Sequence, residues 1–386
     1  MRNWPMIKVA DEFDLQMGKT PARDNPAYWG GEQKWASIAD IARSGMYLSD
    51  TKEAITQEAV SESGIKAVPQ NTVVMSFKLS LGRTAITASR MYTNEAIMAF
   101  LPHDATAFDL HFLYHLFSNR NWSEGCNKAV KGVTLNKATL NAARIPKPDI
   151  SEQRAVASTL DKICALMAKC DEQIVRLDQL VKSRFVEMFG NELEQGRWPS
   201  TTVGEVANVC VGVVIKPTQY YQESGIRAFR SLNIGEMVVK DDDWVFFSET
   251  GHAKNQKSVV HRNDVLVVRS GAPGTACVVP EHFDGCNAVD IIIARPDCNK
   301  VDPTFLAMFT NMPHGKNQIR NQIGGAAQQH YNVGGYKKLQ LIAPPLPLQR
   351  EFAAFVAKVD KLAFAARQRR EVAKQLYRAK IQEFFG

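Results

Sequence analysis

Two polar loops of the sequence carry side chains suited to contact nucleic acid. The first, Gly18–Gly31, is rich in glycine and proline and combines the basic residues Lys19 and Arg23 with an aromatic pair. Basic side chains bind phosphates, and aromatic rings stack on bases. The second, Gly324–His330, holds two glutamines, and glutamine can read adenine through two hydrogen bonds. Both loops favour nucleic-acid binding, and an ordinary surface loop is the alternative for the first.

The predicted nucleic-acid contacts are basic, aromatic, hydroxyl or amide side chains in polar loops or at strand ends. They are Lys19, Thr20, Arg23, Tyr28, Lys34, Arg83 and Lys131 in the first half of the chain, and Lys216, Tyr220, Arg227, Arg230, Arg269, Gln328, Gln329 and His330 in the second. The lysines and arginines would mainly set affinity through phosphates, whereas glutamines and arginines that form paired hydrogen bonds suit base recognition. A solvated surface position is the alternative for each of them.

Three motifs that could support catalysis or metal binding are incomplete. Asn25–Tyr28 resembles the (Asp/Asn)-Pro-Pro-(Tyr/Phe) motif of amino-methyltransferases, but its second proline is replaced by alanine and no glycine-rich cofactor loop precedes it. His111 and His115 lie one helical turn apart without the glutamate of H-E-x-x-H or a third ligand. The loop at Gly324 lacks the Lys-Ser/Thr of a P-loop. The sequence also offers no nucleophilic triad or carboxylate cluster, so we expect no catalytic residue, no metal site and no cofactor in this chain.

The element that must position these loops is a long helix from about Glu152 to Phe189. Ser151 is a candidate N-cap, and Gly190 stands at the usual C-terminal position. The apolar residues alternate in steps of four and three, the repeat of a coiled-coil seam. The seam comprises Val156, Leu160, Ile163, Met167, Cys170, Ile174, Leu177 and Val181. At roughly 55 Å such a helix is typical of a spacer.

The end of the chain repeats this helix about 196 residues later. Pro148, Gln153, Arg154 and Glu187–Gly190 recur as Pro344, Gln349, Arg350 and Glu383–Gly386. The second seam continues through Phe352, Val356, Val359, Ala363 and Ala366 and then meets Arg370, while a track through Leu362 and Leu376 is almost as regular. We predict an intramolecular antiparallel coiled coil, and two unrelated core helices are the alternative.

The globular segments between the helices are also duplicated. Trp4-Pro5 matches Trp198-Pro199, and the strand Val73–Phe77 with its turn at Gly82 matches the strand Val265–Val268 with its turn at Gly274. The intervening stretches differ freely, as expected for one scaffold that presents two different surfaces. The predicted fold class is α+β: two similar mixed α/β domains, each followed by a long helix, with pseudo-twofold symmetry. The predicted boundaries are 1–148 and 191–344 for the domains and 149–190 and 345–386 for the helices.

Composition sets broad limits on the class of protein. The 386 residues are 45% hydrophobic and 23% charged, typical of a globular protein, and no stretch approaches the roughly 20 apolar residues of a membrane span. Seven cysteines without a C-x-x-C pair fit a reducing compartment. With no signal-peptide pattern at the N-terminus, we expect a cytoplasmic protein. The net charge of +7 permits a polyanionic partner without requiring one.

Two duplicated α/β units, each followed by a long helix that is introduced by prolines and then a Gln-Arg pair, resemble the specificity subunit of Type I restriction-modification systems. The residues that carry the resemblance are Ile145–Arg154, Ala343–Arg350 and the loop Gly18–Gly31, and the similarity covers essentially the whole chain. In the second unit, Leu348 stands in place of Glu152, and the Gly-Lys-Thr-Pro loop becomes Gly212–Pro217.

The resemblance implies a non-catalytic DNA-binding subunit. Each target recognition domain would read one half of a bipartite target in the major groove of double-stranded DNA, and the helix pair would fix the gap. The partners implied are two methyltransferase subunits, which bring S-adenosylmethionine, and restriction subunits, which bring ATP and Mg²⁺. The outer faces of the helices and the segments after Pro148 and Pro345 would contact the methyltransferase. The rival classes are a stand-alone methyltransferase or nuclease and a coiled-coil adaptor that binds proteins.

Overall fold

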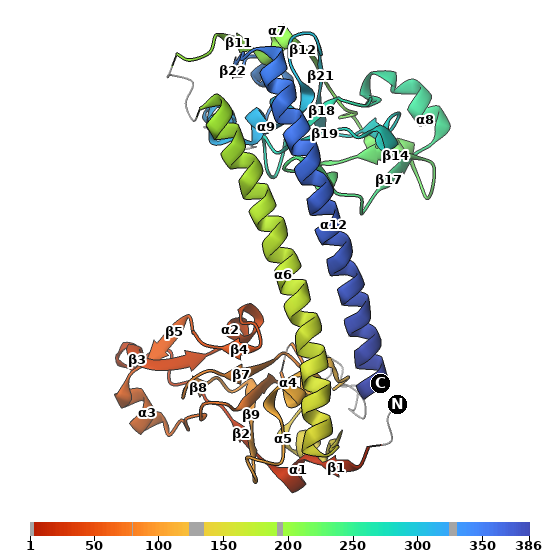
Figure 1. The fold of residues 1–386 in the computed structure, drawn as a ribbon. Helices are drawn as coiled ribbons and strands as arrows, with labels where there is room; N and C mark the ends of the chain where they lie inside the picture. Colours follow the sequence, from red (N-terminus) through yellow and green to blue (C-terminus); the bar gives the residue numbers. More distant parts are fainter. Residues whose placement is uncertain (1–3, 79, 123–134, 191–195, 324–329) are drawn as a thin grey trace. The chain divides into compact units, whose positions relative to one another are not determined.

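The computed structural model describes residues 4–78, 80–122, 135–190, 196–323 and 330–386 (Figure 1). The chain forms two compact units. Unit 1 comprises Met1–Asp171 and Gln368–Gly386, and unit 2 comprises Glu172–Arg367. Each unit contains an α/β domain and one half of each of two long helices, α6 (Ile150–Phe189) and α12 (Leu346–Phe385). Among the described residues, no helix is long and apolar enough to cross a membrane.

The main sheet of unit 1 has five strands in the order β2-β9-β6-β7-β4. Their bounds are β2 Phe13–Met17, β9 Ile97–Pro102, β6 Val73–Ser76, β7 Thr84–Thr87 and β4 Tyr47–Leu48. A smaller sheet, the arm of unit 1, has the order β5-β3-β8, with β5 Glu53–Ile55, β3 Trp29–Ala36 and β8 Tyr92–Thr93. β1 (Met6–Lys8) pairs with β10 (Arg144–Pro146). The helices are α1 Val9–Glu12, α2 Ile38–Arg43, α3 Gln57–Ser63, α4 Leu110–Asn119 and α5 Lys137–Ala142.

Unit 2 repeats this plan. Its main sheet has the order β12-β21-β18-β19, with β12 Ala207–Val211, β21 Ile291–Pro296, β18 Val265–Val268 and β19 Ala276–Val278. Its arm has the order β13-β17-β14-β20, with β13 Tyr221–Gln222, β17 Val245–Phe247, β14 Ile226–Phe229 and β20 Asn287–Ala288. β11 (Ser200–Thr202) pairs with β22 (Gln340–Ile342), and β15 (Ile234–Gly235) pairs with β16 (Val238–Val239). The helices are α7 Val203–Val206, α8 Glu249–Lys254, α9 Pro303–Asn311, α10 Pro313–Ile323 and α11 Val333–Lys337.

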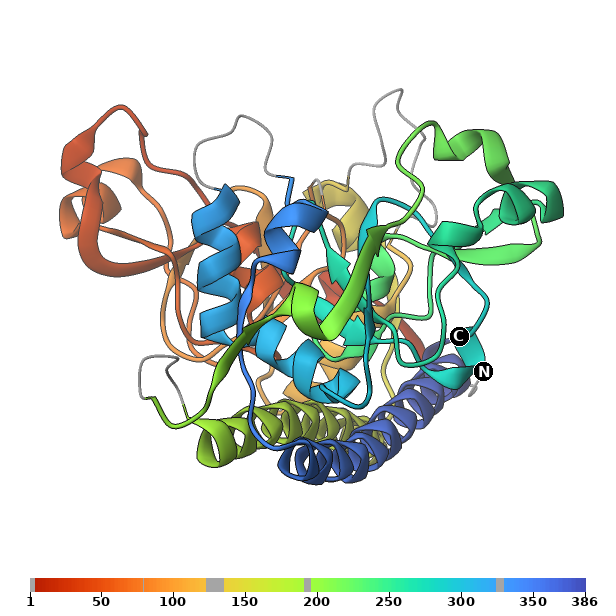
Figure 2. The same ribbon diagram turned by 90° about the horizontal axis from the view of Figure 1, so that it is seen from above.

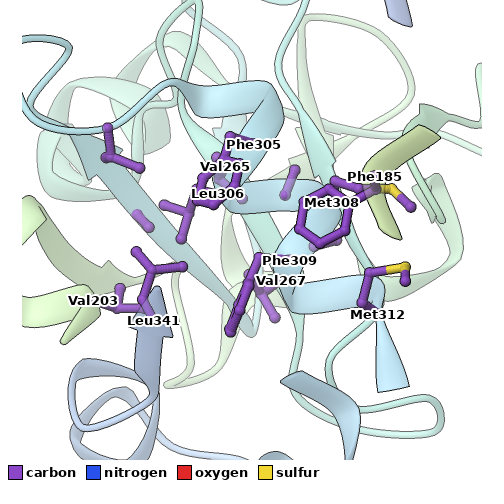
Figure 3. Close-up of a cluster of buried hydrophobic side chains, with 14 of the residues drawn as sticks. Phe185, Val203, Val265, Val267, Phe305, Leu306, Met308, Phe309, Met312 and Leu341 are labelled. Atoms are coloured by element: carbon purple, nitrogen blue, oxygen red, sulfur yellow. The ribbon is translucent and has the colours of Figure 1, made fainter. Parts of the chain in front are cut away.

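Helix α9 joins the main sheet of unit 2 to the long helices. Phe305 of α9 stacks on Phe185 of α6 with ring centroids 5.6 Å apart, and its neighbours pack on Val265 and Val267 of β18. Figure 3 shows these side chains in one core, and Figure 2 shows α9 between the helices and the strands of this unit. Burial of large aromatic and aliphatic side chains on both faces of α9 stabilises this unit.

The predicted long helices are confirmed and pair with each other in each unit. In unit 2, Leu177 and Val181 of α6 share a core with Val356 and Val359 of α12. In unit 1, the first turns of α6 share a core with Phe384 near the end of α12. The start of one helix therefore lies against the end of the other, an antiparallel arrangement.

The burial of individual residues distinguishes the two seam tracks on α12. Val156, Leu160, Ile163, Cys170, Leu177, Val181, Phe352, Val356, Val359, Ala363 and Ala366 are buried, and Met167 and Ile174 are half-buried. The alternative track is wrong at Leu362 and Leu376, which are 54% and 46% exposed, although Ala373 on the same track is buried. Arg370 interrupts the seam where it forms an ion pair with Asp171, with Nε 2.5 Å from Oδ1.

The N-cap assignment of α6 is corrected by the structure. The carboxylate of Asp149, not the hydroxyl of Ser151, accepts a hydrogen bond from a helical backbone amide, that of Glu152 at 2.9 Å. The Asp149 side chain also accepts a hydrogen bond from the Ser151 hydroxyl. Asp149 therefore lies at the position that precedes the helix, where a carboxylate is favoured by the free amides and by the helix dipole.

Candidate nucleic-acid interface

Three loops meet at one edge of the main sheet in each unit. In unit 1, β2 and β6 are both antiparallel to β9. The residues after β2, after β6 and before β9 therefore lie at the same edge. The same antiparallel order of β12, β18 and β21 produces the equivalent edge in unit 2. We call these loops the rim: residues 18–25, 77–78, 80–83 and 94–96 in unit 1, and 212–217, 269–275 and 289–290 in unit 2.

The first rim loop is fixed to the sheet by the same backbone hydrogen bonds in both units. In unit 1, the Gly18 amide donates to the Ile97 carbonyl at 3.1 Å and the Lys19 amide donates to the Thr93 carbonyl at 2.8 Å. In unit 2, the amides of Gly212 and Val213 donate to the carbonyls of Ile291 and Ala288 at 2.9 and 2.8 Å. The repeat predicted between the globular segments therefore extends to individual hydrogen bonds.

A glycine is required at the start of each rim loop. A Cβ atom on Gly18 would lie 2.2 Å from the carbonyl oxygens of Thr93 and Asn94, and one on Gly212 would lie 2.5 Å from that of Ala288. No side chain fits at such distances, since they are well inside van der Waals contact. The shared glycine permits the chain to cross directly over the neighbouring strand.

In unit 1, the predicted contacts of the first rim loop are held by hydrogen bonds within the protein. The Arg23 guanidinium forms a two-pronged ion pair with Glu53 of the arm, at 2.6 and 3.1 Å, and lies 3.8 Å from the ring centroid of Trp29. The hydrogen bond from Arg23 holds the pKa of Glu53 below its usual value. Thr20 donates its hydroxyl hydrogen to Glu95, and the Lys19 ammonium donates to the Ser63 carbonyl.

The other predicted residues of unit 1 lie on the arm or at the second rim loop. Tyr28 donates its hydroxyl hydrogen to Glu62 at 2.6 Å, which raises the pKa of the phenol, and Lys34 donates to the Ser49 carbonyl at 2.5 Å. Arg83 is exposed in the turn between β6 and β7, and its guanidinium has no ion-pair partner within the part of the chain that the structure describes. Lys131 lies outside the described residues.

In unit 2, the structure brings Arg269, His330 and the first rim loop together. The Arg269 side chain forms an ion pair with Asp290 and donates to the Tyr331 carbonyl at 3.0 Å. The Asp290 amide in turn donates to the Val213 carbonyl at 3.1 Å. His330 Nδ1 lies 2.5 Å from the hydroxyl of Ser270. Two segments that are far apart in the sequence are thus connected at one sheet edge.

The remaining predicted residues of unit 2 differ in their surroundings. Lys216 is exposed, has a left-handed backbone with φ of 44°, and has no charged partner among the residues described. Tyr220 packs on Phe247, with ring centroids 5.6 Å apart. Arg227 and Arg230 lie on the arm and form ion pairs with Asp241 and Asp243 at 3.4 and 3.2 Å. Gln328 and Gln329 lie outside the described residues.

The histidine pair forms a polar network in unit 1. His111 Nδ1 and His115 Nε2 lie 2.6 and 2.8 Å from the two carboxylate oxygens of Asp161 on α6. His115 Nδ1 is 3.1 Å from the hydroxyl of Tyr377 on α12. Burial lowers the pKa of His115, although the hydrogen bond to Asp161 opposes this shift. No cluster of three or more His, Cys, Asp or Glu side chains suited to a metal was found among the residues that the structure describes.

A buried glutamine attaches each α/β domain to the start of a long helix. In unit 1, Gln153 Oε1 accepts from the amide of Asp109, the N-cap of α4, at 2.9 Å, and its Nε2 donates to the Ala107 and Pro148 carbonyls. In unit 2, Gln349 accepts from the amide of Asp302, the N-cap of α9, at 2.9 Å, and donates to the Pro344 carbonyl. The sequence repeat identified both glutamines but not their partners.

The acidic partners of three predicted contacts, and one apolar residue of the rim, were not predicted from the sequence. Glu53, Glu95 and Asp290 were not identified, because no spacing rule connects them to Arg23, Thr20 and Arg269. Ile215 was part of the loop compared with Gly18–Gly31, but its exposure of 79% is visible only in the structure.

Comparisons with known proteins find similarity to one family. Residues 1–176 match the model of the Type I restriction modification DNA specificity domain. The Type I restriction enzyme MjaIX specificity subunit of Methanocaldococcus jannaschii is 22% identical over 381 residues, covering 92% of this chain and 86% of the relative. The Type I restriction enzyme EcoR124I/EcoR124II specificity subunit of Escherichia coli is 24% identical over 177 residues, 44% of this chain and 43% of the relative. The fold is similar to the crystal structure of the S subunit of a Type I restriction-modification system from M. genitalium, with a TM-score of 0.60, 14% identity, and coverage of 100% of this chain and 96% of that one.

Proposed function

Because the chain is similar to the specificity subunits of Type I restriction-modification systems, we propose that its two rims bind the two halves of a bipartite DNA target. The observation that carries the proposal is the duplication of the rim: the same backbone hydrogen bonds fix both first loops, while their side chains differ. A shared frame with different side chains is what two readers of unlike half-sites require.

The helix pair acts as the spacer in this proposal. α6 and α12 each contain 40 residues, and a helix of this length measures about 60 Å. The distance between two readers sets the spacing of the sequences that they recognise. The helices would therefore fix the number of unread base pairs between the half-sites, and their outer faces would contact two methyltransferase subunits.

The chemistry belongs to the partners. The methyltransferase subunits would bind S-adenosylmethionine and methylate adenine, and restriction subunits would add ATP- and Mg²⁺-dependent cleavage. This chain would recognise the target DNA sequence and would contribute no catalytic group.

Within the rims, the exposed cations without ion-pair partners are the best candidates for phosphate contacts. Among the described residues, Arg83 in unit 1 and Lys216 in unit 2 also lack a side-chain hydrogen bond, whereas Lys19 donates to the Ser63 carbonyl. Loss of one phosphate contact reduces the slope of log K against log salt by about 0.9. By contrast, Arg23 and Arg269 already hold carboxylates and would orient neighbouring groups rather than bind phosphate.

The proposal is tested by co-expressing the chain with its methyltransferase subunit and mapping methylated adenines across the host genome. We expect a two-part motif with a gap of constant length. The methyltransferase without this chain is the control and should give no such motif. A single contiguous motif, or methylation that is the same with and without the chain, would overturn the proposal.

A further inference from the structure

An apolar side chain projects from the rim of unit 2. Ile215 is 79% exposed, the largest value among the big hydrophobic residues that the structure describes, and its neighbour Val214 is 49% exposed. An isoleucine left in water forgoes the favourable burial that this side chain normally gains in a protein interior. Its position on the rim makes it a candidate contact for a partner outside the chain.

The loop that carries Ile215 is held firmly at both ends. On one side, the amide and carbonyl of Val213 form hydrogen bonds with the carbonyl of Ala288 and the amide of Asp290, at 2.8 and 3.1 Å. On the other side, a short helical turn, Pro217–Tyr220, begins directly after the left-handed residue Lys216. A short loop fixed in this way presents its tip in one orientation, so the exposure of Ile215 is a feature of the fold.

The chemistry around Ile215 is that of a DNA-binding surface. Lys216, the next residue, is an exposed cation, and Asp290, which is bonded to the loop through Val213, holds Arg269. A phosphate group attracts the Lys216 ammonium, but it offers nothing to an aliphatic side chain. The edges of the base pairs in the major groove carry one apolar group, the 5-methyl group of thymine.

The equivalent loop of unit 1 has a different character. It carries Lys19 and Thr20 at the positions of Val213 and Val214, and Thr20 is hydrogen bonded to Glu95. The loop is also longer, and its Ala22 carbonyl accepts a hydrogen bond from the Trp29 indole at 3.1 Å. The residue at the position of Ile215 is Pro21, which is buried, so the loop of unit 1 presents no exposed aliphatic tip there.

We propose that Ile215 is a specificity-determining residue that packs against the 5-methyl group of a thymine in the half-site bound by unit 2. The inference rests on the proposed function, because it requires that the rim of unit 2 enters the major groove. It predicts that this half-site contains at least one A·T pair and that the methyl group itself contributes to affinity.

The test uses the chain in complex with its methyltransferase subunit and duplexes that contain the methylated motif. Each thymine of the half-site bound by unit 2 is replaced in turn by deoxyuridine, which removes only the methyl group. We expect one position at which deoxyuridine weakens binding about fourfold, the effect of one buried methyl group. With Ile215→Ala, binding to the thymine duplex should weaken by a similar factor, and thymine and deoxyuridine at that position should bind equally.

Two controls test whether the preference for thymine depends on Ile215. Leu232→Ala removes another exposed aliphatic side chain of unit 2 that lies outside the rim loops, and it should leave the preference for thymine intact. Deoxyuridine in the half-site bound by unit 1 should affect the wild-type chain and Ile215→Ala equally.

The inference is overturned if the half-site contains no A·T pair, if no thymine position responds to deoxyuridine, or if Ile215→Ala keeps the preference for thymine. In each case the complex would still bind its bipartite target, so the proposed function would stand. A complex without any sequence preference would instead overturn the proposed function together with this inference.

Discussion

The two recognition domains share their backbone connections and differ in how the rim side chains are used. In unit 1, Arg23 and Thr20 are bonded to Glu53 and Glu95, and the first rim loop is folded onto the arm. In unit 2, the loop is shorter and exposes Ile215 and Lys216. The hydrogen bonds of Gly18 and Gly212 are nevertheless the same.

The shared features are those that the fold requires, and the differing features are those that can vary with the DNA sequence to be recognised. The features that both units share are backbone hydrogen bonds, a glycine at a close approach, a buried glutamine and an Asp N-cap. The features that differ are side chains at a surface. Substitutions in the shared set should therefore affect stability in both units, whereas substitutions in the variable set should affect DNA binding in one.

The largest expected effect comes from the helix seam. Phe352 is fully buried, and its ring lies 5.4 Å from that of Phe185, whereas its counterpart in the repeat, Val156, is a smaller buried residue. We expect Phe352→Ala to reduce the free energy of unfolding by about 4 kcal/mol and Val156→Ala by about 2 kcal/mol. Leu362→Ala is the exposed control and should cost less than about 0.5 kcal/mol. Urea denaturation measures all three, and equal losses for Phe352 and Leu362 would contradict the seam.

The buried glutamines give the next effect. Gln153 makes three hydrogen bonds and Gln349 makes two. Replacement by alanine leaves buried polar groups without partners, so we expect losses of about 3 kcal/mol for Gln153→Ala and about 2 kcal/mol for Gln349→Ala. Denaturation of the two variants side by side would test this order. If neither variant is less stable than the wild type, the glutamines do not attach the domains to the helices.

The rim glycines should be equally intolerant of a side chain. Because a Cβ atom would collide with backbone carbonyls at both positions, Gly18→Ala and Gly212→Ala should each cost about 2 kcal/mol. Gly45→Ala is a matched control, since nothing lies within 4 Å of its added Cβ. Thermal denaturation, together with DNA binding to each half-site, checks the prediction. A Gly18→Ala chain as stable as Gly45→Ala would contradict the close approach.

The smallest expected effect is the pH dependence of stability that His115 causes in unit 1. His115 has a folded-state pKa below its unfolded value because it is buried, whereas its counterpart on α9 is Met308, which is apolar. Below the unfolded pKa of about 6.5, the unfolded chain takes up a proton that the folded chain does not, so stability falls on acidification.

The loss is at most about 1.4 kcal/mol per pH unit for one proton. Hydrogen exchange in α4 and α9 between pH 7 and 5.5, corrected for the intrinsic rate, would measure it. We expect α4 to lose protection relative to α9 in the wild type and to lose less in His115→Asn. The same loss in both variants would show that another group titrates.

The sequence predicted the helices and the repeat because both depend on local periodicity. The apolar residues from Val156 to Val181 follow a regular 3.5-residue spacing, so their burial could be anticipated. On α12 the spacing admits two tracks, and only packing shows that Leu362 faces water. The N-cap was misplaced because Asp149 and Ser151 are both good capping residues and the choice depends on where the helix begins.

The candidate interface was predictable only in part. Lys216, Arg269 and His330 were identified by residue type, but their proximity depends on strand order and on the pairing of Tyr331 with Arg269. The ion pair joins Arg23 in a loop to Glu53 in β5, and no periodic pattern in the sequence predicts such a pair. The roles of all these residues in DNA binding stay predictions.

The most direct test of the account is an exchange of one recognition domain. Residues 1–147 would be replaced by the corresponding segment of a related specificity subunit, and the methylated motif would be mapped in the presence of the methyltransferase subunit. We expect one half of the motif to change while the other half and the gap stay the same. A change in both halves, or in the length of the gap, would contradict the claim that each rim reads one half-site and that the helices set the spacing.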